Sequence, residues 1–273
     1  MNTTTAHPAA PTRSVRLIGA PTDIGAGARG ASMGPEALRV AGLQQALESR
    51  GLQVCDLGNL TGPANPWLPP VNGYRHLPEV VQWNQRVFDA VFAQLQQGHL
   101  PILLGGDHSL GLGSISAVAR HCVEAGKKLR VLWLDAHADF NTSALTPSGN
   151  VHGMPVACLC GFGPAELTQL AHMPGGGPAL HPSQIRQIGI RCVDEGEKRF
   201  VLEQGLEGHE CRHDGAGAGS QPARRGQVGF QVQGHGREVQ PPEGQCLPEG
   251  GMGLEHEVAL PGQAAGMGTV QAE

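Results

Sequence analysis

A short apolar run ends in three side chains whose spacing suits metal binding. The segment 131–140, VLWLDAHADF, places Asp135, His137 and Asp139 at alternate positions after its apolar residues. Alternate residues of an extended backbone point to one side, so we expect two carboxylates and an imidazole to converge. Such a set binds a hard or borderline divalent metal ion. A solvated acidic turn is the usual alternative for a single D-x-H pair, whereas the full D-x-H-x-D motif favours the metal.

A second imidazole follows another apolar run. The segment 100–106, LPILLGG, continues into Asp107, His108 and Ser109. A histidine in GGDHS is by itself more often a helix-entry or core residue, but beside the D-x-H-x-D motif we interpret it as a ligand. Carboxylate and imidazole ligands without thiolate suit Mn²⁺, and other borderline metals are compatible with them. Two ions that share a carboxylate would activate a bridging water as hydroxide. The predicted metal ligands are His108, Asp135, His137 and Asp139.

Strand and helix patterns alternate along the chain and must position these residues. Apolar runs predict strands at 14–21, 52–58, 100–106, 129–134 and 184–191, and periodic patterns predict helices at 35–51, 79–96, 109–125, 164–173 and 195–204. This alternation predicts an α/β fold, a three-layer αβα arrangement with a central, mostly parallel β-sheet. Ligands of such folds bind beyond the carboxyl ends of the strands, where GGDHS, DAHADF and RCVD all lie.

A glycine-rich loop at 22–34 offers a different chemistry. Gly25, Gly27 and Gly30 satisfy G-x-G-x-x-G, a dinucleotide-binding pattern. The loop lacks the G-K-[ST] ending of a P-loop, and no acidic residue stands at a strand end about 20 residues later. We therefore favour a tight loop near the active site, in which glycine permits close approach of the backbone.

Composition excludes several classes of partner. A net charge of −5 gives no reason to expect nucleic acid or an acidic membrane surface. No apolar stretch is long enough to span a bilayer, and residues 1–13, predicted to be disordered, contain no apolar signal segment. The seven cysteines are odd in number and scattered, which predicts reduced thiols in a cytoplasmic protein.

Several motifs together resemble the ureohydrolase family, and the arginases within it most closely. They occur in the family's order and span most of residues 14–207. The matching segments are GAPTDIGAGARGASMGPEALR (19–39), GGDHSLGLGS (105–114), DAHADFNT (135–142), SGNVHGMP (148–155) and IGIRCVDEGE (188–197). The resemblance implies an arginase/deacetylase-like fold with two Mn²⁺ ions in the active site.

The resemblance also implies a role for each site residue. His108 and Asp139 would hold one Mn²⁺, His137 would hold the other, and Asp135 would bridge both. A metal-bridging hydroxide would attack the guanidinium carbon of L-arginine, giving urea and L-ornithine, with His152 shuttling protons. The substrate's α-amino group would bind Asp194, and its α-carboxylate would bind Asn141, Ser148 and Asn150. Considered alone, those last three residues indicate ordinary turn chemistry.

The family comparison leaves one alternative substrate and one departure. Agmatine is another guanidino substrate, although Asn141 with SGNVHGMP favours an amino-acid substrate. Cys192 stands where arginases commonly carry Asp, in RDVD. The family also implies a homo-oligomer, a trimer or hexamer.

The composition changes after Glu207. Residues 208–273 hold 15 Gly and 8 Gln, and only nine of these 66 residues are Leu, Ile, Val or Phe, too few to bury a core. The family's S-x-D-x-D-x-x-D-P motif, whose first two aspartates complete the metal site, is absent, as is a later Glu that binds the guanidinium. We therefore predict an arginase-like domain at 14–207 whose C-terminal part is incomplete, and a non-family tail at 208–273, disordered and read from a shifted frame. Activity would be low, or the chain would be an inactive family member.

Overall fold

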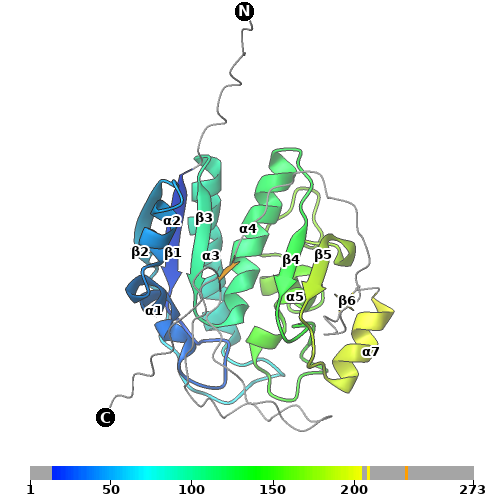
Figure 1. Cartoon of the computed structure of the whole chain (residues 1–273). Helices are drawn as coiled ribbons and strands as arrows, with labels where there is room; N and C mark the ends of the chain where they lie inside the picture. The colour runs from blue at the N-terminus through cyan, green and yellow to red at the C-terminus, as the bar shows by residue number, and fades with distance from the viewer. Residues whose placement is uncertain (1–13, 205–207, 210–230, 233–273) are drawn as a thin grey trace, which may run out of the picture.

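Parallel strands and helices alternate as the sequence predicts. The computed structural model describes residues 14–204, 208–209 and 231–232 (Figure 1). The strands are β1 (Val15–Ala20), β2 (Val54–Asn59), β3 (Leu100–Gly105), β4 (Val131–Leu134), β5 (Ile185–Ile188), β6 (Gly208–His209) and β7 (Gln231–Val232). The α-helices are α1 (Gly34–Val40), α2 (Leu43–Glu48), α3 (Leu77–Gln96), α4 (Gly111–Glu124), α5 (Pro155–Leu159), α6 (Ala165–Thr168) and α7 (Glu195–Glu203). Short 3₁₀ turns are η1 (Ala31–Met33), η2 (His108–Leu110), η3 (Val151–Gly153) and η4 (Pro182–Gln184).

The strands form two parallel sheets. The first has the order β2-β1-β3-β7 and pairs Val15 with both Val54 and Leu100. The second has the order β4-β5-β6 and pairs Val131 with Ile185. Within the described residues no ladder joins β3 to β4, and Figure 1 shows the two sheets as separate groups of arrows. The predicted parallel sheet is thus present in two parts.

Side chains that alternate along β1 and β3 form a core on each face of the first sheet. Leu17 and Leu104 pack with Leu38 and Leu43 of α1 and α2. The other face carries Ile18 and Leu103, which belong to a larger cluster with residues of α3, α4 and α5. Because strand side chains alternate between faces, both faces of this sheet must be covered, which gives three layers.

The two long helices, α3 and α4, cover the face of the first sheet that carries Ile18 and Leu103. Gly113 of α4 lies so close to α3 that an added Cβ would meet the carbonyl oxygen of Asn84 at 2.3 Å. The side chain of the buried Asn84 accepts a hydrogen bond from the Gly113 N–H at 2.7 Å. Glycine is therefore required for this contact, which holds α4 and the preceding η2 turn in place.

Two predicted helices differ in extent from the structure, and one short helix was not predicted. The helix expected at 35–51 is divided into α1 and α2, because Gly42 has a left-handed backbone with φ of 78°. The helix expected at 164–173 covers only Ala165–Thr168. The short helix α5 was not predicted, because a five-residue helix that begins with proline carries too little periodic pattern.

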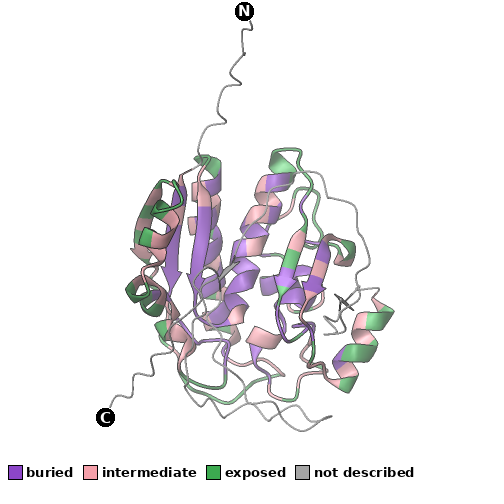
Figure 2. Cartoon of the chain, viewed as in Figure 1, coloured by how far each residue is buried: buried purple, intermediate pink, exposed green. Residues whose placement is uncertain are grey.

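The outer face of β4 is exposed. Leu132 and Leu134 expose 51% and 67% of their surface, whereas Trp133 between them is 3% exposed. Figure 2 shows exposed and half-buried positions along β4 and mainly buried ones along β1 and β3. Within the part of the chain that the structure describes, β4 is therefore covered well on one face only.

The predictions for both ends of the chain lie largely outside the described residues. Those for 1–13 and for most of 208–273 fall there, while β6 and β7 each add two residues to a sheet. Cys192 is in a disulfide, so the expectation that all seven cysteines are reduced is wrong at that position. Four other cysteines, Cys55, Cys122, Cys158 and Cys160, are free. Of the helices in the described ranges, none is both long and apolar enough to cross a membrane.

Candidate metal centre

His108 lies at the carboxyl end of β3, in a turn fixed by its neighbour. The side chain of Asp107 accepts the N–H of Ser109 at 2.9 Å and the N–H of Gly25 at 2.9 Å. The imidazole of His108 stacks on Trp133 of β4, with ring centroids 4.4 Å apart. These contacts direct His108 from the first sheet toward the end of the second.

Asp135 and Asp139 meet His108 there. The Nδ1 atom of His108 is 2.8 Å from Asp135 Oδ2 and 2.7 Å from Asp139 Oδ2. One ligand atom from each residue lies within 4.8 Å of the others, close enough to share a metal ion. Asp139 has a left-handed backbone with φ of 49°, so the segment is not extended throughout as assumed. The two carboxylates nevertheless converge.

His137 is placed differently. Its side chain is 49% exposed, and its Nδ1 atom is 3.5 Å from Asp135 Oδ1. Its backbone bridges to Cys192, next to the end of β5. The structure therefore brings three of the four predicted ligands into one cluster and places His137 at the edge of that cluster, beside Asp135.

The charges in this cluster are strongly coupled. Burial opposes protonation of His108, but the carboxylates of Asp139 and Asp135 outweigh it and raise the pKa of His108 to about 10. Burial would also raise the pKa of Asp135, yet hydrogen bonds from His108 and His137 hold that pKa well below its usual range. Burial raises the pKa of Asp139. In the metal-free protein the imidazolium of His108 balances the carboxylates.

The donor set fits a divalent cation. Asp139 Oδ2 is buried and, although close to His108, accepts no hydrogen bond of good geometry from the described residues. Such an oxygen is costly to bury unless a cation balances it. Two carboxylates and an imidazole without thiolate match the preference of Mn²⁺ and similar ions.

Two predicted substrate-binding residues contact each other. The amide Nδ2 of Asn141 donates a hydrogen bond to Asp194 Oδ2 at 3.1 Å. The Oδ1 atom of Asn141 is buried and has no hydrogen-bond partner in the described part of the chain. Asn141 lies two residues after Asp139, and Asp194 is the N-cap position of α7, so this contact joins the end of the D-x-H-x-D segment to the start of that helix.

The loop before η3 is organised by its own hydroxyl groups. Thr146 Oγ1 accepts hydrogen bonds from the backbone N–H groups of Ser148 and Gly149 at 3.3 and 3.0 Å. Ser148 Oγ accepts the N–H of Asn150 at 3.2 Å. This is the turn chemistry that the sequence suggested as an alternative. The side chain of Asn150 is buried, and Arg75 donates to it.

His152 lies in η3, close to the cluster. Its backbone N–H donates to the carbonyl oxygen of Gly25 at 3.1 Å. The charge of its side chain lowers the pKa of Asp139, which places the two groups within electrostatic reach. The predicted proton shuttle and the predicted metal ligands therefore share one region.

Sequence reasoning missed Glu197. This buried carboxylate in α7 accepts the backbone N–H of Phe140 at 2.7 Å and so holds the residue after Asp139. Burial raises the pKa of Glu197 to about 7, the charges of Asp139 and Asp194 act in the same direction, and the Phe140 hydrogen bond opposes them. Its place in VDEGE beside a predicted site residue was the available signal.

The glycine-rich loop packs tightly against the candidate site. A Cβ added at Gly25 would meet Ser109 at 2.7 Å, and one added at Gly27 would meet Asn150 at 3.1 Å. The N–H groups of Gly25 and Gly30 bind the carboxylates of Asp107 and Asp23. These amides therefore satisfy side chains of the protein itself, which favours the tight-loop interpretation over dinucleotide binding.

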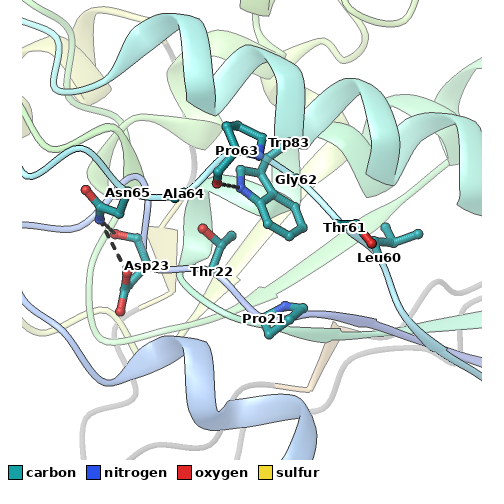
Figure 3. A pocket seen from close by; sticks show the side chains of 10 residues that line it. All are labelled: Pro21, Thr22, Asp23, Leu60, Thr61, Gly62, Pro63, Ala64, Asn65 and Trp83. Atoms are coloured by element: carbon teal, nitrogen blue, oxygen red, sulfur yellow. Dashed lines mark hydrogen bonds between the residues drawn. The ribbon is translucent and has the colours of Figure 1, made fainter.

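A pocket of about 280 Å³ lies beside this loop (Figure 3). Asn65 donates to the carbonyl and carboxylate oxygens of Asp23, and Trp83 donates to the carbonyl oxygen of Pro63. The lining residues are Pro21, Thr22, Asp23, Leu60, Thr61, Gly62, Pro63, Ala64, Asn65 and Trp83. They include none of the predicted site residues, so this pocket is separate from the metal cluster.

Known proteins resemble this chain over the region that carries the cluster. The arginase of Bacillus caldovelox is 40% identical over 197 residues, which are 71% of this chain and 64% of that protein. The arginase of Brevibacillus brevis is 37% identical over 71% of this chain and 63% of its own length. The chain therefore spans just under two thirds of the length of these relatives.

Solved structures of arginases are also similar to this chain. The Bacillus caldovelox arginase has a TM-score of 0.67 at 38% identity, covering 72% of this chain and 64% of that one. An Entamoeba histolytica arginase solved in complex with L-ornithine has a TM-score of 0.64 at 32% identity, covering 72% of this chain and 65% of that one. The Arginase family itself matches residues 13–221, which extend beyond Glu207. From the sequence match and the fold together, this chain belongs to the arginase family.

Proposed function

We propose that this chain carries part of the active site of a manganese-dependent arginase, which hydrolyses L-arginine to L-ornithine and urea. The observation that supports this most strongly is the convergence of His108, Asp135 and Asp139 at the ends of two parallel strands. These three residues would hold Mn²⁺, with His137 as a further ligand next to Asp135. The bound metal would supply a Lewis acid that lowers the pKa of water, which hydrolysis of a guanidinium group requires.

The neighbouring residues supply binding and proton transfer. Asp194 would bind the α-amino group of the substrate, and Asn141, hydrogen-bonded to Asp194, would bind the α-carboxylate. Ser148 and Asn150 would add donors to that carboxylate from the adjacent loop. His152 would transfer a proton to the leaving amine. The Entamoeba histolytica relative was solved with L-ornithine, an amino acid with the same head group as L-arginine.

We also propose that hydrolysis by this polypeptide is impaired. Asp214 is the only aspartate in residues 208–273, so the sequence holds no second aspartate pair there. One metal position keeps His108, Asp135 and Asp139, whereas the other keeps only Asp135 and His137. Both positions lack aspartate ligands that the family resemblance implies. We therefore expect the first position to bind Mn²⁺ weakly and the second hardly at all, because affinity depends on the number and geometry of the ligands. The competing proposal is a family member without catalysis, or one that acts on agmatine.

Metal content and urea release distinguish these proposals. The purified chain is incubated with Mn²⁺, desalted and analysed for manganese, and urea is measured with L-arginine and with agmatine. Slow release of urea with L-arginine and none with agmatine supports an impaired arginase. Release of urea with agmatine supports agmatine as the substrate. Bound metal without urea supports an inactive member. Turnover at the rate of the Bacillus caldovelox arginase, assayed alongside, contradicts the proposed impairment.

Assembly and location remain predictions. We propose the homo-oligomer, trimer or hexamer, that the family resemblance implies, and the cytoplasmic location that the scattered cysteines suggest. Light scattering on the purified chain tests the assembly, and fractionation of the producing cells tests the location. A monomeric chain contradicts the assembly proposal.

A further inference from the structure

Arg75 makes two hydrogen bonds to the segment 148–150, SGN, which carries two of the proposed head-group residues. Its Nε–H donates to Asn150 Oδ1 at 2.6 Å, and its backbone N–H donates to the carbonyl oxygen of Gly149 at 2.8 Å. A third hydrogen bond runs from Nη1 to the carbonyl oxygen of Leu68 at 3.0 Å. The guanidinium is therefore fixed on both sides, between the loop before α3 and the SGN segment.

The chemistry of arginine then determines how the Asn150 amide is oriented. A guanidinium has donors and no acceptor, so only the oxygen of the Asn150 amide can face it favourably. The opposite orientation would direct an NH₂ group at a cation inside a buried site, because Asn150 is 3% exposed. The Nδ2 group must therefore point away from Arg75. The whole amide packs beside Gly27, where an added Cβ would meet Nδ2 at 3.1 Å and Oδ1 at 3.3 Å.

We propose that Arg75 is a positioning residue for substrate selectivity. By binding Oδ1 of Asn150, it presents the donor side of that amide to the α-carboxylate of the substrate. This inference rests on the proposed function, in which Asn150 helps to bind that carboxylate. This orientation should increase the affinity for a substrate that has the α-carboxylate and leave the affinity for one that lacks it unchanged.

Three substitutions of Arg75 separate this role from general stability. Arg75→Lys keeps a cation that can donate to Oδ1, and Arg75→Met removes the donor. Arg75→Gln is the sharpest variant, because its amide can offer either an acceptor or a donor and so permits both orientations of Asn150. Arg50→Gln is the matched control, because Arg50 also donates to a backbone carbonyl, that of Ala46 in α2.

The test compares L-arginine with agmatine, which lacks the α-carboxylate, by calorimetric titration of the full chain with Mn²⁺. The wild-type chain should bind L-arginine more tightly. Arg75→Gln and Arg75→Met should reduce this preference about twofold where both amide orientations are equally populated. The reduction should reach about tenfold, the loss of one hydrogen bond to a charged group, where the reversed orientation prevails. Agmatine binding should be unchanged in all variants, and Arg75→Lys and Arg50→Gln should keep the wild-type preference.

Side-chain amide spectra provide a second measurement that does not need substrate. The NH₂ signals of Asn150, assigned by loss in Asn150→Asp, should be a single sharp pair in the wild-type chain and broadened or doubled in Arg75→Gln. An unchanged preference in Arg75→Gln, or unchanged signals, overturns the role of Arg75 alone. A wild-type chain that binds both guanidines equally, or neither, overturns the head-group pocket itself and the role of Arg75 in selectivity with it.

Discussion

The side-chain amide of Asn141 donates a hydrogen bond to the carboxylate of Asp194 at 3.1 Å. The two residues are 53 positions apart and follow different strands, β4 and β5, of the same sheet. The contact joins the residue proposed for the α-carboxylate to the residue proposed for the α-amino group. The contact therefore holds the two proposed head-group residues side by side.

Asp194→Asn should weaken binding of L-arginine by about tenfold, because the α-ammonium group loses a charged partner. Binding of 5-guanidinovalerate, which has the carboxylate but no α-amino group, should change by less than about threefold. Competition binding with both ligands measures the difference. Equal losses for the two ligands would show that Asp194 only supports the loop.

His108→Asn should destabilise the metal-free chain by roughly 3 kcal/mol, because it removes the cation between two buried carboxylates. Urea unfolding in the presence of a chelator measures the free energy of unfolding. His137→Asn is the matched control and should cost less than about 1 kcal/mol, because its side chain is 49% exposed. A larger loss from the His137 substitution would contradict the assignment of His108 as the central group.

The stability of the metal-free chain should fall as the pH rises from about 6.5 to 10. The pKa of His108 is raised from 6.5 to about 10 in the folded protein, so the folded state binds the proton more tightly than the unfolded state. The stabilisation by the His108 proton is complete below pH 6.5, the unfolded pKa, and is lost as the pH passes about 10, the folded pKa. Melting temperatures across this range test the trend, which should be much weaker in His108→Asn.

Glu197→Gln should stabilise the metal-free chain above pH 7, on the order of 3 kcal/mol from the size of the pKa shift. The raised pKa means that the ionised carboxylate is disfavoured in the fold, so wild-type stability falls as the pH rises from about 4.5 to 7. Glutamine keeps an oxygen for the Phe140 N–H and carries no charge. The free energy of unfolding of both chains is measured at pH 4.5 and pH 8. If the two chains differ by the same amount at both pH values, ionisation of Glu197 is not the cause.

Much of the fold follows from local pattern. Buried parallel strands are continuous apolar runs, so β1 and β3 were predictable, and so was the placement of His108 and Asp135 at strand ends. Helix boundaries were less predictable, because a single left-handed glycine, Gly42, divides a pattern that is otherwise continuous.

Other features depend on contacts between distant segments. Glu197 reaches Phe140 across 57 positions, and Arg75 reaches Asn150 across 75, so no local spacing indicates either contact. The left-handed backbone of Asp139 departs from the extended geometry assumed for the motif, and His137 lies at the edge of the cluster. The division of the parallel strands into two sheets likewise depends on which strands come together, not on any one of them.

The most direct test of the central claim is a titration of the 273-residue chain with Mn²⁺, followed by electron paramagnetic resonance. The claim is that His108, Asp135 and Asp139 form one metal position and that the other is incomplete. The account predicts one weak site per chain, lost in Asp139→Asn, and little urea release. Two tightly bound ions per chain, or one that Asp139→Asn leaves unchanged, would contradict it.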